Sequence, residues 1–85
     1  MRVSEFEQAV FDTEDVVIRI RAPLAKEVDD YEYERQASGA TSVTNWLETR
    51  ILPKLRGNQV SIVDGNGQTP HGRTKLETLR STYER

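Results

Sequence analysis

An alternation of apolar and polar side chains over residues 15–22 constrains the fold of this chain more than any other feature. The apolar positions are Val16, Ile18 and Ile20. Arg19 and Arg21 occupy the positions between them. Because side chains along a β-strand point alternately to its two faces, this pattern predicts a strand with one buried face. Pro23 lacks a backbone N–H and should end the strand.

Two further segments have the composition of strands. Residues 31–35 alternate tyrosine with glutamate, and residues 59–63 are rich in branched apolar side chains. We expect the first two strands to pair antiparallel, with Ile20 opposite Tyr31 and Ile18 opposite Tyr33. The same register sets two pairs of opposite charges across the outer face, Arg19 with Glu32 and Arg21 with Asp30.

Helical periodicity marks three more elements. Ser4 is expected to cap the first helix, and Thr41 or Ser42 the second. Pro53 should kink or end that second helix. A third helix is expected over residues 75–83. The buried faces of helices and strands together predict a core of Phe6, Val10, Ile18, Ile20, Trp46, Leu47, Ile51, Ile62, Leu76 and Leu79.

The resulting order of elements is α-β-β-α-β-α. It predicts one small α+β domain over residues 1–85, with a three-stranded mixed sheet packed with helices. The helix between the second and third strands should form a right-handed crossover.

Composition narrows the class of protein. The chain has 85 residues and no cysteine, so it forms neither a disulfide scaffold nor a thiolate metal site. One histidine cannot supply the usual His/Cys ligands of zinc within a monomer. No apolar run approaches the roughly 18 residues of a membrane span. We therefore expect a soluble protein that has no membrane association and is cytoplasmic.

The densest group of side chains that could bind a ligand or take part in a reaction lies in the last third of the chain. Residues 67–74 read Gly-Gln-Thr-Pro-His-Gly-Arg-Thr, which resembles a phosphate-binding loop with arginine in place of lysine. That motif cradles phosphate with backbone N–H groups at a helix N-terminus. Arg73 is a planar fork rather than a point charge, and Pro70 removes one N–H from the cradle. The segment therefore departs from a nucleotide-binding loop.

A turn followed by a capped helix explains most of the same residues. Residues 64–67 form two turn dipeptides, Asp-Gly and Asn-Gly. Thr74 and Glu77 have the spacing of a capping box, in which each side chain serves the other residue's backbone N–H. Leu76, Leu79 and Tyr83 then share one helical face.

An anion site at the start of this helix is the alternative interpretation. Basic side chains would gather where free amides and the helix dipole favour anions. The candidate anion-binding residues are His71, Gly72, Arg73, Thr74, Lys75 and Arg80.

The charge distribution leaves both interpretations open. Residues 1–36 carry ten acidic and five basic side chains, whereas residues 37–85 carry four acidic and seven basic. The basic second part predicts either a surface for a polyanion or a region that the acidic first part neutralises.

Catalysis and metal binding have little basis in the sequence. His71 is the only conventional general base, and its neighbours Thr69 and Thr74 are weak nucleophiles. The acidic residues between Glu27 and Glu34 lack the spacing of a calcium loop. We predict no enzymatic activity, no metal and no cofactor.

Two hypotheses of function follow. The first is a small non-enzymatic interaction or regulatory domain whose partner is another protein or a second copy of the chain. An exposed sheet edge would support it, as would exposed side chains among Leu24, Val28, Leu52 and Leu55. The second is a binder of phosphate, another anion or nucleic acid that uses residues 69–80. It requires Arg73, Lys75 and Arg80 to face outward and converge with Arg50, Lys54 or Arg56.

Overall fold

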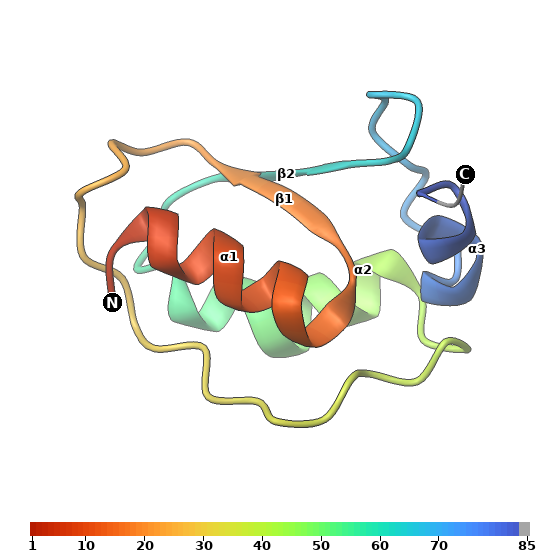
Figure 1. Ribbon diagram of the computed structural model, residues 1–85, viewed down its shortest axis with the longest axis horizontal. Coiled ribbons are helices and arrows are strands. Elements are labelled where there is room, and N and C mark those ends of the chain that lie inside the picture. Colours follow the sequence, from red (N-terminus) through yellow and green to blue (C-terminus); the bar gives the residue numbers. More distant parts are fainter. Residues whose placement is uncertain (84–85) are drawn as a thin grey trace.

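The computed structural model describes residues 1–83 and shows a small α+β fold (Figure 1). Its elements are α1 (Val3–Glu14), β1 (Val17–Ile20), α2 (Val43–Trp46), η1 (Leu47–Ile51), η2 (Leu52–Lys54), β2 (Val60–Val63) and α3 (Leu76–Ser81). The segments α2, η1 and η2 are successive α, π and 3₁₀ turns. The predicted α+β class is confirmed.

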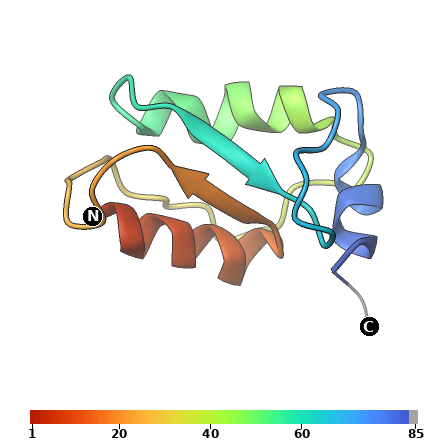
Figure 2. The same cartoon turned by 90° about the horizontal axis from the view of Figure 1, so that it is seen from above.

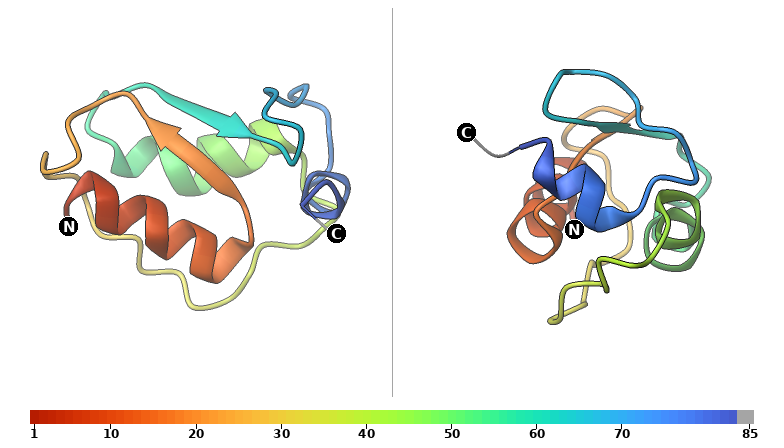
Figure 3. Two further views of the ribbon diagram at one scale, coloured as in Figure 1. Left: turned by 45° about the horizontal axis from the view of Figure 1, so that its top comes forward. Right: turned by 90° about the vertical axis from the view of Figure 1, so that its right-hand side faces the viewer.

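Helix α1 and the segment from α2 to η2 lie on one side of the sheet (Figure 1). Seen from above, β1 lies beside α1, and β2 lies beside the segment from α2 to η2 (Figure 2). The view along the molecule shows both helical segments below the strands, with α3 at one end (Figure 3, right). In residues 1–83, no helix combines the length and apolar character needed to cross a bilayer.

The sheet has two antiparallel strands, so the predicted three-stranded mixed sheet and the order around it are wrong. Val17 pairs with Val63, Ile18 with Ile62, Arg19 with Ser61 and Ile20 with Val60. The expected right-handed crossover linked residues 31–35 to residues 59–63, and it is absent from the described fold because residues 31–35 form no strand. The predicted pairs of Arg19 with Glu32 and of Arg21 with Asp30 are also wrong, because β1 pairs with β2 instead.

Residues 31–35 belong to no strand in the described structure. Tyr31 is buried and Tyr33 partly buried, whereas Glu32 and Glu34, which alternate with them, are exposed. The alternation therefore reported correctly which side chains face inward. It did not reveal what they face, because the two tyrosines pack on helices and on an arginine rather than across a ladder.

The helix termini differ in part from expectation. Arg2, rather than Ser4, occupies the cap position of α1, and its N–H donates to the Glu5 carboxylate at 2.9 Å. Ser42 caps α2 as predicted, accepting from the Asn45 N–H at 3.2 Å. Asp15 ends α1 in the left-handed conformation, with φ of 56°. This residue turns the chain from α1 directly into β1.

The predicted core is confirmed except for Leu47, which is partly buried. The structure adds the buried apolar residues Val3, Val16, Val28, Tyr31, Ala37, Val43 and Leu55. Of the four side chains proposed for an exposed apolar surface, Leu24 and Leu52 are exposed, and Val28 and Leu55 are buried.

Candidate functional site

The first backbone amides of α3 already have partners within the fold. The Leu76 N–H donates to the Thr41 carbonyl at 2.8 Å, and the Glu77 N–H to the Gly39 carbonyl at 3.0 Å. The predicted Thr74 capping box is wrong, because Lys75 holds the cap position and its side chain makes no cap bond. The free amides expected to attract an anion are thus committed to the segment before α2.

The turn before α3 is held against the start of α2. The Val43 N–H donates to the Thr74 carbonyl at 2.8 Å, and the Thr44 N–H to the Gly72 carbonyl at 3.0 Å. A Cβ on Gly72 would lie 2.2 Å from the Thr44 hydroxyl oxygen, so any larger residue would require the Thr44 side chain to move. His71 Nδ1 accepts from the Arg73 N–H at 3.1 Å. Each of these contacts stabilises the turn itself.

The Arg80 side chain does not join the other candidate anion-binding residues, because it points toward Glu14 and Ala37. Its Nε donates to the Glu14 carbonyl at 2.8 Å and one guanidinium NH to the Ala37 carbonyl at 3.0 Å. Arg50, expected to join the same basic surface, pairs with the Glu14 carboxylate at 2.8 Å. Arg56 pairs with Asp29 at 3.0 Å. The acidic first part of the chain therefore neutralises much of the basic second part.

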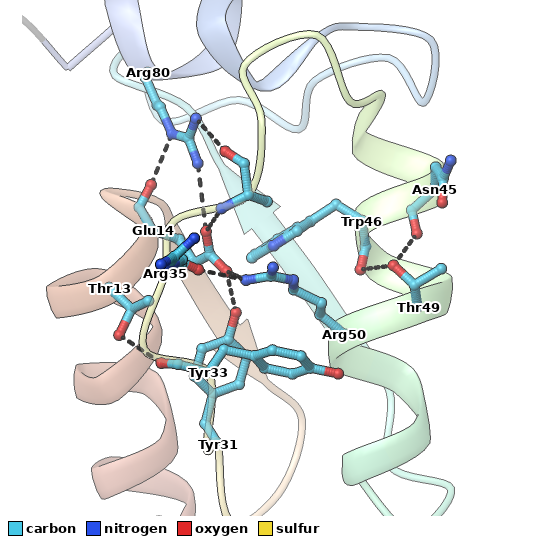
Figure 4. Close-up of polar contacts among 11 residues, drawn as sticks. Thr13, Glu14, Tyr31, Tyr33, Arg35, Asn45, Trp46, Thr49, Arg50 and Arg80 are labelled. Atoms are coloured by element: carbon cyan, nitrogen blue, oxygen red, sulfur yellow. Dashed lines mark hydrogen bonds and ion pairs between the residues drawn. The ribbon is translucent and has the colours of Figure 1, made fainter.

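Glu14 is the centre of a buried polar cluster, shown in Figure 4. The Glu14 cluster comprises Glu14, Tyr31, Arg50, Arg80 and the backbone of Ala37. The fully buried carboxylate accepts from the Tyr31 hydroxyl and from the Ala37 N–H at 2.8 Å. Arg50 donates at 2.8 Å, and Arg80 lies at 3.4 Å. Two arginines, a phenol and an amide thus surround one carboxylate.

These contacts decide the protonation of the cluster. Burial alone would raise the pKa of Glu14, but hydrogen bonds from Tyr31, the Ala37 amide and Arg50 outweigh it and leave that pKa below its ordinary value. Burial and the adjacent carboxylate raise the pKa of the Tyr31 hydroxyl. The indole N–H of Trp46 has no partner in ordinary hydrogen-bond geometry within the described chain, yet its proximity also lowers the pKa of Glu14. The cluster therefore holds an ionised glutamate and a neutral tyrosine.

The Glu14 cluster has the properties of a structural anchor. A carboxylate offers about four acceptor positions, and four donors occupy them here. Arg50 also donates to the Arg35 carbonyl at 2.8 Å and lies 4.2 Å above the Tyr33 ring centre. The cluster thereby holds residues 31–37, in the long connection between β1 and α2, against α1, η1 and α3.

Sequence reasoning overlooked Glu14, although a signal was present. Val3, Phe6 and Val10 form the buried stripe of α1, and Glu14 follows Val10 by four residues. A glutamate on the apolar stripe of a helix is a charge that needs buried partners. Those partners are far away in the sequence and could not be named from it.

A second feature is a groove between α1 and β1, here called the β1 groove. It has a volume of about 550 Å³ and is lined by Ser4, Glu7, Gln8 and Phe11 of α1, by Val17, Ile18, Arg19 and Ile20 of β1, and by Leu24. Phe11 is 45% exposed and Leu24 62% exposed. Large exposed apolar side chains therefore lie beside the edge of β1, whose own residues Ile18 and Ile20 are buried.

The register shows which backbone groups of β1 face the groove. Arg21 N–H donates to the Gln59 carbonyl at 2.8 Å, which marks a hydrogen-bonded pair. Hydrogen-bonded pairs alternate along an antiparallel ladder, so Arg19 also faces β2. The N–H and C=O groups of Ile18 and Ile20 consequently point to the other edge. Within residues 1–83, the Ile18 N–H has no hydrogen-bond partner.

The other three outward groups on this edge are bonded within the chain. The Ile20 carbonyl accepts from the Ala22 N–H at 2.9 Å, and side chains occupy the remaining two positions. Glu7 Oε2 accepts from the Ile20 N–H at 2.8 Å. The Arg19 guanidinium donates to the Ile18 carbonyl at 3.0 Å. At the end of the ladder, the Tyr83 hydroxyl accepts from the Val17 N–H at 3.2 Å and donates to the Val63 carbonyl, thereby linking the two strands.

Comparisons with protein-family models, with curated proteins and with solved structures find no match to this chain. The geometry of the described residues is therefore the basis for any proposal of function.

Proposed function

We propose that this protein is a small non-enzymatic interaction domain that binds an extended segment of another protein along the open edge of β1. The observation that carries the proposal is the β1 groove, where a strand edge with no neighbouring strand among residues 1–83 lies beside exposed apolar side chains. Extended peptides bind other domains by adding a strand to such an edge, with pockets beside it for alternate side chains.

The composition of the groove fits this mode of binding. The Ile18 N–H is unbonded within the described part of the chain, and the other outward backbone groups of Ile18 and Ile20 become available when their internal partners are displaced. Phe11 and Leu24 supply apolar surface beside them. Phe11 and Leu24 are exposed. Burying them against a partner would remove apolar surface from water. A helix on one side of the groove and a strand on the other would hold a peptide in one orientation.

The alternatives have weaker support. The Glu14 cluster has its acceptor positions filled, which leaves the carboxylate without a free site for a substrate. An anion or nucleic-acid binder using residues 69–80 retains the exposed side chains of His71, Arg73 and Lys75. Arg80 and the first α3 amides have internal partners instead.

The test is an NMR titration with a short synthetic peptide that alternates valine and threonine. We expect saturable shifts of the Ile18 and Ile20 amides and of the Phe11 ring, and slower hydrogen exchange at the Ile18 amide. Phe11→Ala and Leu24→Ala should weaken binding. Leu52→Ala is the matched control, because Leu52 is 44% exposed but lies outside the groove lining.

A second control addresses the backbone directly. The same peptide with alternate backbone nitrogens methylated keeps its side chains but cannot complete the strand pairing. Its affinity should fall about tenfold, since each lost backbone bond is worth roughly 1 kcal/mol. The proposal is overturned if the unmethylated peptide leaves the β1 amides unchanged, or if both peptides bind equally.

A further inference from the structure

The outer face of β1 carries positive charge without a carboxylate opposite it. Arg19 pairs with Ser61, and Arg21 lies opposite Gln59. Both arginines are exposed, and neither forms an ion pair with any residue among 1–83. On a strand, opposite charges directly across the ladder stabilise the pairing, and like charges destabilise it.

The two side chains bound to the open edge occupy places that an added strand would use. The Glu7 carboxylate accepts from the Ile20 N–H, as the carbonyl of a neighbouring strand would. The Arg19 guanidinium donates to the Ile18 carbonyl, as the N–H of that strand would. An incoming strand therefore has to replace both, and also the Ala22 N–H that donates to the Ile20 carbonyl at 2.9 Å. The Arg19 side chain is then free to contact the side chains that the added strand presents on the outer face of the sheet.

On the inner side of the sheet, an added strand would meet apolar side chains. Ile18 and Ile20 face the core, and Phe11 and Leu24 line the adjoining groove. Side chains of an added strand alternate between this inner side and the outer side that carries Arg19 and Arg21.

We infer that the partner of the β1 groove is an extended protein segment that alternates apolar with acidic residues. Its apolar side chains contact Phe11 and Leu24, and its carboxylates pair with Arg19 and Arg21 on the outer face. Its backbone replaces Glu7 and Arg19 on the strand edge. This inference rests on the proposed function and specifies the partner's chemistry.

A second copy of the chain fits the groove less well than such a segment. The β1 strand reads Val-Ile-Arg-Ile, so a second β1 strand would bring another arginine and no carboxylate of its own. The chain's formal net charge of −2 also repels an acidic partner weakly at long range. A preference for acidic peptides would therefore report the local arginines rather than the overall charge.

The experiment compares three short peptides in which valine alternates with glutamate, threonine or lysine. Affinities are measured by NMR titration of the Ile18 and Ile20 amides at low and high salt. We expect the glutamate peptide to bind about tenfold more tightly than the lysine peptide, with the threonine peptide between them. High salt should reduce this ratio because the charges are exposed.

Two variants with equal loss of charge separate local from general electrostatics. Arg19→Gln should reduce the glutamate-to-lysine ratio to roughly threefold, since one of two cross-strand pairs is lost. Arg73→Gln removes an exposed positive charge from the turn before α3 and should leave the ratio unchanged.

The outcomes distinguish this inference from the proposed function. Equal binding of the three peptides at β1 overturns the acidic partner while the interaction domain stands. Binding by none of them overturns the proposed function and this inference together. Concentration-dependent shifts of the β1 amides in the free protein would identify a second copy as the occupant and also overturn the inference.

Discussion

The Glu14 cluster and the β1 groove contain the same kinds of charged side chain but have opposite roles. Each has a glutamate and an arginine hydrogen-bonded to backbone groups. In the cluster the carboxylate is fully buried, and its four donors come from three segments: the connection between β1 and α2, η1 and α3. In the groove Glu7 is partly buried and Arg19 is exposed, and each makes a single bond to the edge of β1.

This difference teaches how burial changes the consequence of one interaction. A buried charge that loses its partner cannot recover the lost hydrogen bonds from water, so removal is costly. An exposed side chain that leaves a strand edge is solvated at once, and its place can be taken by another backbone. Charges in the cluster therefore hold the fold, whereas those in the groove can be replaced.

The largest expected effect follows the loss of the cluster's carboxylate. Glu14→Ala leaves Arg50 and Arg80 without their partner and should reduce the free energy of unfolding by about 3–5 kcal/mol. Urea unfolding measures it. Glu48→Ala, at an exposed position on η1, should stay within about 0.5 kcal/mol of the parent. A Glu14→Ala variant that loses less than about 1 kcal/mol would show that the cluster is not an anchor.

Lowering the pH should reduce the contribution of Glu14 to the free energy of unfolding. The pKa of Glu14 in the fold lies below the ordinary value of 4.5, so the unfolded chain takes up the proton first. Its contribution to stability is present above about pH 4.5 and is lost as the pH falls through the folded pKa. Urea unfolding across this range should give a steeper pH dependence for the parent than for Glu14→Gln. Parallel curves would contradict the assignment of an ionised Glu14.

A smaller effect is expected at the junction of the two strands. Tyr83→Phe removes the hydroxyl that links the Val17 N–H to the Val63 carbonyl. The cost should be about 1–3 kcal/mol, because two backbone groups lose a partner. Hydrogen exchange at the Val17 amide should accelerate more than exchange in α1. Equal acceleration throughout would instead indicate a general loss of packing.

The groove should tolerate the loss of its own carboxylate. Glu7→Ala frees the Ile20 N–H and should cost no more than about 1 kcal/mol. Hydrogen exchange at the Ile20 amide should become faster, while the Leu76 amide serves as an internal control because its carbonyl partner is Thr41. An effect on stability as large as that of Glu14→Ala would erase the distinction between the two regions.

The smallest effect is expected from added phosphate. The Leu76 and Glu77 amides have carbonyl partners, so they should show no saturable shift in an NMR titration. Arg73→Ala serves as the control for weak association with the exposed basic side chains. Saturable shifts at both amides that Arg73→Ala abolishes would restore the anion site predicted from the sequence.

Local patterns in the sequence were sufficient for much of the fold. The alternation around Ile18 and Ile20 located β1, and the apolar run near Ile62 located β2. Trp46 was assigned to the core from its helical spacing and is fully buried. These features depend on which side of an element is apolar, a property that neighbouring residues encode directly.

The tertiary structure decided which residues meet. Tyr31 alternates with its neighbours as a strand residue would, yet its hydroxyl binds Glu14. Thr74 has the spacing of a helix cap, but carbonyls of Gly39 and Thr41 take the α3 amides. Arg80 looked like part of a basic surface and instead faces Glu14 and Ala37. Periodicity reports the inward side of an element, whereas partners across the core depend on how distant segments pack together.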